Sequence, residues 1–93
     1  MVVGLAVWDM QLPGCHSLKE KRSVLKSLKD RMHNQFNVSA AETAHQNAHQ
    51  RAELAACVVS ADRSHANSVL DVLDRFLEME ARVRIVDSYT TYY

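Results

Sequence analysis

The chain has 93 residues, of which 47% are hydrophobic and 24% are charged, with 11 basic and 11 acidic side chains. This length and composition predict one globular domain over residues 1–93. A net charge of zero excludes attraction of the whole molecule to nucleic acid or an anionic membrane, so such a partner would need a local patch. No apolar run approaches the ~20 residues of a membrane span. We expect no membrane partner, and two cysteines without a C-x-x-C pair favour reduced thiols and a cytoplasmic protein.

Alternating apolar residues predict a first strand from Val2 to Leu12. The even positions are all apolar or glycine, so we expect Trp8 in the core. The odd positions Val3, Leu5 and Val7 are also apolar, which indicates that the second face of this strand is apolar as well.

The sequence Pro13-Gly14 breaks the chain before a helix predicted from about Leu18 to Gln35. Ser17 and Glu20 have the S-x-x-E spacing of a capping box, in which Glu20 would reach back to the N–H of residue 17. The apolar stripe of this helix contains Val24, Leu25, Leu28 and Met32.

The rest of the chain predicts three more strands and one helix. Phe36 to about His45 alternates as a strand, and a polar turn follows over residues 46–50. Ala52 to Ala61 is apolar almost throughout, which is typical of an interior strand. A helix begins around residues 60–64 and ends near Met79, and Arg82 to about Tyr92 has the composition of a last strand.

The resulting order, βαββαβ, predicts an α+β ferredoxin-like fold: a four-stranded antiparallel sheet with both helices on one face. The other face would then be open and apolar, which usually marks an interface. We therefore expect a homodimer or a higher homo-oligomer, through sheet faces or through edges. The residues predicted on the open face are Val3, Leu5, Val7, Ala55, Cys57 and Val59.

Four short blocks of the sequence resemble the YlxP-like family of small bacterial proteins. They are PGCHSLKEKR at 13–22, FNVS with the following AE at 36–42, HQ at 45–46 and QRAEL at 50–54. The resemblance implies a ferredoxin-like fold and no assigned function. The family's genes commonly lie among those for translation initiation and ribosome maturation factors, which implies a role near the ribosome. This chain has His49 where the family usually has Trp, and Asn47 where it usually has Asp, so no role of that aromatic is carried over.

The predicted first helix concentrates positive charge, with six basic and two acidic residues between His16 and Gln35. Residues 62–80 carry two basic and five acidic residues. At about 100° per residue, Lys19, Arg22, Lys26, Lys29 and His33 share one stripe. Such a stripe is either an ordinary solvated helix face or a ridge that contacts phosphates. The candidate phosphate-binding residues are Lys19, Lys21, Arg22, Lys26, Lys29 and Arg51.

No residue set predicts catalysis, a metal or a cofactor. His45 and His49 are four apart, but they lie in strand and turn rather than on a helix, where that spacing would bring them together. Cys15 and His16 are adjacent and lack a third group to orient the imidazole.

We therefore expect a non-enzymatic binding protein that acts on RNA or a ribosomal subunit, with no DNA partner. The alternative is an oligomeric regulatory module that binds a small molecule.

Overall fold

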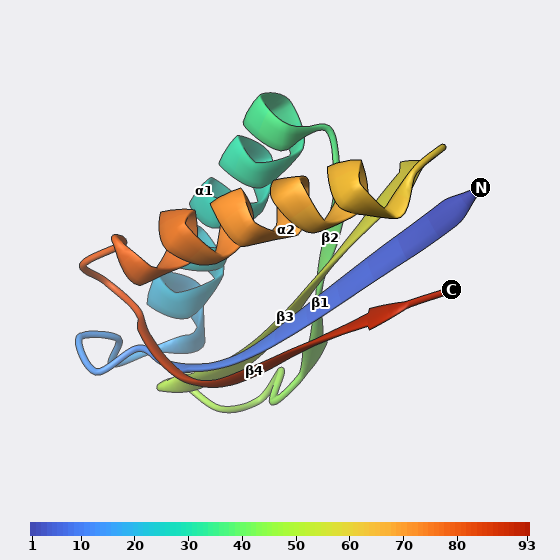
Figure 1. Ribbon diagram of the computed structural model, residues 1–93. Helices are drawn as coiled ribbons and strands as arrows, with labels where there is room; N and C mark the ends of the chain where they lie inside the picture. The colour runs from blue at the N-terminus through green and yellow to red at the C-terminus, as the bar shows by residue number, and fades with distance from the viewer.

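The centre of the molecule is strand β1, paired on both sides in a four-stranded antiparallel sheet of order β2-β3-β1-β4. The computed structural model describes residues 1–93, and both helices cover the same face of the sheet (Figure 1). The predicted ferredoxin-like fold is therefore confirmed. The elements are β1 (Val2–Gln11), α1 (Leu18–Phe36), β2 (Ser39–Ala44), β3 (Arg51–Ser60), α2 (Arg63–Glu78) and β4 (Arg84–Tyr92).

Helix α1 begins with a cap close to the predicted one. The Ser17 hydroxyl accepts from the backbone N–H of Glu20 at 3.1 Å. The Glu20 carboxylate accepts from the N–H of His16 at 3.2 Å, one residue earlier than the capping box predicts.

The end of α1 corrects the predicted start of the second strand. Asn37 adopts a left-handed conformation with φ 51° and donates its N–H to the carbonyl of His33, which closes the helix. Phe36 therefore belongs to α1, and β2 begins at Ser39 rather than at Phe36.

The core lies between the sheet and the two helices. Trp8 is buried as predicted, at 1% exposure, and lies opposite Leu54 of β3. Its indole N–H donates to the Asp74 carboxylate at 2.9 Å, which satisfies the one polar atom of the ring and ties β1 to α2.

The opposite face of the sheet carries the residues expected there, in register across β1 and β3. Val3 faces Val59, and Leu5 faces Cys57. Val7 is a correction: it is 6% exposed, because it lies between Ala55 and Tyr89 of the two neighbouring strands, and so offers almost no surface to a partner.

Both edge strands are irregular. The pairing of β4 with β1 shifts register between Asp9 and Met10, and the pairing of β2 with β3 shifts between Glu42 and Ala44. Each shift is a bulge, which bends the strand and interrupts the regular ladder.

Candidate phosphate-binding surface

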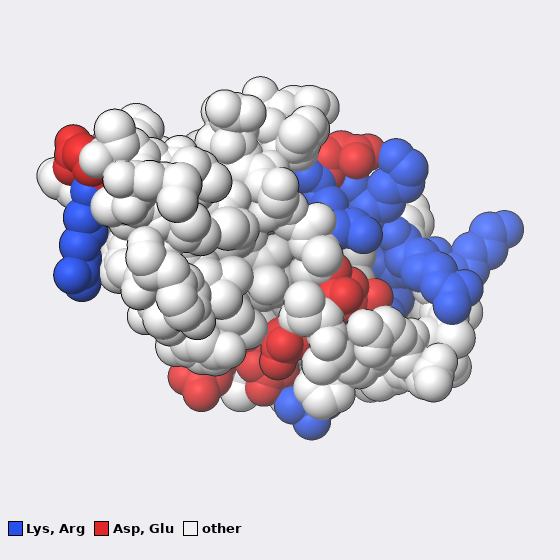
Figure 2. Space-filling model, turned by 90° about the vertical axis from the view of Figure 1, so that its right-hand side faces the viewer, with Lys and Arg blue, Asp and Glu red and all other residues white.

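The predicted basic stripe exists on α1. Lys19, Arg22, Lys26 and His33 are exposed, and Lys29 is half-buried at the side of the helix that faces β2. The largest group of Lys and Arg side chains in Figure 2 lies on the side of the molecule where α1 is placed. We call Lys19, Arg22, Lys26 and Lys29 the α1 basic stripe.

Most of this stripe is free of acidic partners. Lys26 Nζ lies 2.6 Å from Asp30 Oδ2, but both side chains remain mostly in solvent, at 75% and 57% exposure, so this pair is weak and easily exchanged. Lys19, Arg22 and Lys29 form no ion pair. The stripe can therefore present cationic donors to an anionic partner.

Lys21, which the sequence analysis placed among the phosphate-binding residues, is fully buried. Its ammonium lies 2.8 Å from Glu42 Oε2 and donates to the carbonyls of His45 at 2.8 Å and Arg51 at 3.2 Å. The ammonium thus has two hydrogen-bond acceptors and one ion-pair partner inside the protein, and the buried Glu42 Oε2 atom has no hydrogen-bond donor of its own. Lys21 connects α1 to both sides of the turn between β2 and β3 and cannot contact RNA.

Arg51 is also separated from the α1 basic stripe. It lies on β3, and its side chain pairs with Asp9 on β1, with Arg51 Nη2 3.1 Å from Asp9 Oδ2. Asp9 and Arg51 belong to the sheet face opposite the helices, since Met10 and Ala52 are buried on the helix side. The structure therefore does not bring Arg51 together with the stripe.

Arg31 and Arg82 converge on Glu80, a grouping that the sequence analysis missed. Arg31 Nη2 donates to one oxygen of Glu80 at 2.9 Å, and Arg82 Nε donates to the other at 2.6 Å. These hydrogen bonds, above all that from Arg82, lower the pKa of Glu80 to about 2. The three residues join α1 to the turn between α2 and β4, a contact between segments 49 residues apart that spacing along the chain does not reveal.

The cysteines and histidines are dispersed. No three His, Cys, Asp or Glu side chains lie close enough together to hold a metal ion. Cys15 is buried, and burial raises the pKa of its thiol. Cys57 is half-buried on the open sheet face. His45 has a φ of 65° at the start of the hairpin turn.

Neither helix of the protein is long and apolar enough to cross a membrane.

Comparison with known proteins identifies the family. A model described as "Protein of unknown function (DUF503)" matches residues 3–90. The chain belongs to this family. It is 35% identical over 86 residues to the uncharacterized protein YlxP of Bacillus subtilis (strain 168), covering 88% of this chain and 94% of that protein.

The chain is also similar in fold to two solved designed proteins. The de novo designed protein Foldit4 has a TM-score of 0.57 at 10% identity, covering 98% of this chain and 97% of its own. The designed protein LFR1 1, described as having a ferredoxin fold, has a TM-score of 0.56 at 16% identity, covering 100% of this chain and 83% of its own. At these identities the likeness concerns the fold alone.

Proposed function

We propose that this protein is a non-enzymatic, cytoplasmic binding protein whose α1 basic stripe contacts the phosphate backbone of RNA, including RNA of a ribosomal subunit. The single observation that supports this is the stripe itself: four cationic side chains on one side of one helix, of which only Lys26 has an acidic partner. Residues 19–29 span about 15 Å at 1.5 Å per residue, which is long enough to reach several successive phosphates.

The proposal is tested by RNA affinity at several salt concentrations. Labelled single-stranded RNA and purified ribosomal subunits are titrated with the wild type and with Lys26→Gln/Lys29→Gln. Losing two phosphate contacts should weaken binding and reduce the slope of log K against log salt by about 1.4 on single-stranded RNA.

The matched control removes the same charge elsewhere, with Arg75→Gln/Arg84→Gln on α2 and β4. These two arginines are exposed and lie outside the stripe, so affinity and slope should stay close to those of the wild type. The proposal fails if both double variants bind alike, or if wild-type binding is insensitive to salt.

We also propose that a second copy of the chain covers the open sheet face. Its support is apolar area left in solvent: Val59 is 66% exposed and Tyr89 is 60% exposed, beside half-buried Leu5 and Cys57. Sedimentation at micromolar concentration should then give a species heavier than 10.5 kDa.

The control for self-association compares two identical substitutions. Val59→Glu should dissociate the oligomer, because it places a charge on the open face. Val72→Glu should leave it intact, because Val72 is a 40% exposed valine of α2 on the other side of the molecule. A wild type that sediments only as a monomer removes this proposal and leaves the one on RNA standing.

A further inference from the structure

A pocket opens beside the N-terminal half of α1, between the β1–α1 loop and the α2–β4 turn. Its volume of about 670 Å³ lies within the range of sites that enclose small organic ligands. Its lining comes from three separate segments and consists of Pro13, Gly14, Cys15, Lys19, Glu20, Ser23, Val24, Ala81 and Arg82.

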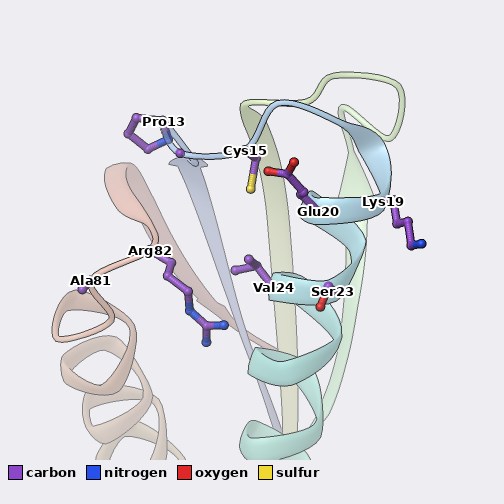
Figure 3. A pocket seen from close by; sticks show the side chains of 9 residues that line it. Pro13, Cys15, Lys19, Glu20, Ser23, Val24, Ala81 and Arg82 are labelled. Atoms are coloured by element: carbon purple, nitrogen blue, oxygen red, sulfur yellow. The ribbon is translucent and has the colours of Figure 1, made fainter.

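The pocket has an apolar wall and two ionised groups, the Arg82 guanidinium and the Glu20 carboxylate, which lies beside Cys15 in Figure 3. In Figure 3 the Cys15 sulfur, the Val24 methyls and the Arg82 side chain point toward the same space, whereas Lys19 points away from it. Pro13 and Ala81 add further apolar surface at the loop side. Burial raises the pKa of the Cys15 thiol, so this part of the wall is neutral at physiological pH.

The charge at Arg82 is only partly neutralised. Arg82 and Arg31 share a single carboxylate, that of Glu80, so one positive charge of the three groups remains uncompensated. Arg82 commits Nε to Glu80 and has a long contact of 3.5 Å from Nη2 to the Ser27 hydroxyl, while Nη1 forms no hydrogen bond. Guanidinium N–H donors therefore remain for an acceptor in the pocket.

The lining contains one acidic residue, Glu20, whose carboxylate keeps its negative charge while it accepts from the N–H of His16 at 3.2 Å. Lys19 and Arg82 belong to the same lining, so its ionised side chains sum to one positive charge. The pocket thus combines apolar walls with one cationic donor group that is unsaturated, a combination that fits a ligand with an apolar body and a single negative charge.

We propose that this pocket binds a small organic monoanion, a carboxylate attached to an aromatic or branched aliphatic body. The carboxylate accepts from the free N–H groups of Arg82, and the apolar body lies against Val24 and Cys15. This function lies beyond RNA binding. The pocket shares only Lys19 with the α1 basic stripe, and no variant in either test changes Lys19, so either activity can fail without the other.

The proposal is tested with an isosteric pair of probes, 2-naphthylacetate and its neutral amide, by NMR titration of the ¹⁵N-labelled protein. The carboxylate should bind about tenfold or more tightly than the amide, since the amide carbonyl can accept from Arg82 but carries no negative charge. The shifted resonances should be those of residues 13–15, 23–24 and 81–82. No saturable shift, equal affinities for the two probes, or shifts confined to another region would each overturn the proposal.

Two variants separate ligand binding from folding. Arg82→Gln should reduce the affinity for the carboxylate to that of the amide, whereas Arg84→Gln, two residues along and outside the pocket, should leave it unchanged. Ala81→Phe adds a ring at an exposed turn position of the pocket lining and keeps both Arg82 and Glu80, and it should abolish binding of both probes. Retained binding in either Arg82→Gln or Ala81→Phe contradicts the proposed site.

The Cys15 thiol provides an independent readout within the wild type. Bound 2-naphthylacetate should slow the alkylation of Cys15 by iodoacetamide and leave the rate at Cys57, on the opposite sheet face, unchanged. Equal effects on both cysteines, or none on Cys15, would count against a ligand in this pocket.

Discussion

Replacing Lys21 by methionine is the sharpest test of how the β2–β3 hairpin is held on α1. Methionine has a similar length and no charge, so the substitution keeps most of the side-chain volume and removes the ammonium. Glu42, which is 15% exposed, then loses its ion-pair partner, and the carbonyls of His45 and Arg51 lose their donor.

The expected loss is large because charge is left buried without a partner. Removing one member of a buried ion pair costs about 3–5 kcal/mol. A domain of 93 residues has a total free energy of unfolding of roughly 5–14 kcal/mol, so the loss is a substantial part of it. At about 4–8 °C per kcal/mol for domains of this size, the Tm should fall by at least about 12 °C.

The assay is guanidinium unfolding of the wild type, Lys21→Met, Glu42→Leu, Lys26→Met and Lys21→Met/Glu42→Leu. Lys26→Met is the matched control, because Lys26 also pairs with a carboxylate on the same helix but in solvent, and it should change stability by less than about 1 kcal/mol. The double variant should lose less than the sum of Lys21→Met and Glu42→Leu measured alone, since the unpaired carboxylate is gone as well. A cost below about 1 kcal/mol for Lys21→Met, or additive losses in the cycle, would refute the argument from buried charge.

Further predictions concern acid stability, thiol reactivity and backbone packing. The pKa of Glu80 is lowered to about 2 from 4.5, so its contribution to stability is complete above about pH 4.5 and is lost as the pH falls toward 2. Glu80→Gln should flatten the pH dependence of unfolding in that interval, and an unchanged profile would show that other carboxylates dominate it. Cys15 should react with iodoacetamide more slowly than Cys57 at neutral pH, because Cys15 is buried and burial raises the pKa of its thiol; a faster Cys15 in peptide mapping contradicts this. Gly4→Ala should destabilise the fold by about 1–3 kcal/mol, because its Cβ would lie 3.0 Å from a core side chain. Gly14→Ala meets nothing within 4 Å and should be neutral within about 0.5 kcal/mol, and equal unfolding midpoints for the two variants would refute this difference.

Local patterns in the sequence were sufficient for the fold. The alternation around Trp8 and the S-x-x-E cap at Ser17 are short-range signals, and the structure places both as predicted, apart from the one-residue shift of the Glu20 contact. The left-handed Asn37 was the exception, because a helix end that depends on one αL residue leaves little trace in the hydrophobic pattern.

The site was only partly predictable, and Lys21 shows why. Lys21 precedes Leu25 and Leu28 by four and seven residues, so helical periodicity alone puts it on the buried side of α1, and this signal was overlooked. Periodicity could not predict the partners of Lys21. Glu42 and the His45 carbonyl are more than 20 residues away in the sequence, and only the position of the β2–β3 hairpin against α1 brings them to the ammonium. The pairing of Arg51 with Asp9 likewise depends on strand register, which one sequence does not supply.

The two bulged edges affect how copies of this protein can meet. An evenly paired strand at the rim of a sheet offers a template for another chain, and repeated addition there leads to aggregates without a defined size. In this protein each edge strand shifts its pairing register with the neighbouring inner strand: β2 shifts at Glu42/Ala44, and β4 shifts where it pairs with Asp9/Met10 of β1. The kinks work against the addition of further strands at either edge, so the proposed self-association depends on the open sheet face.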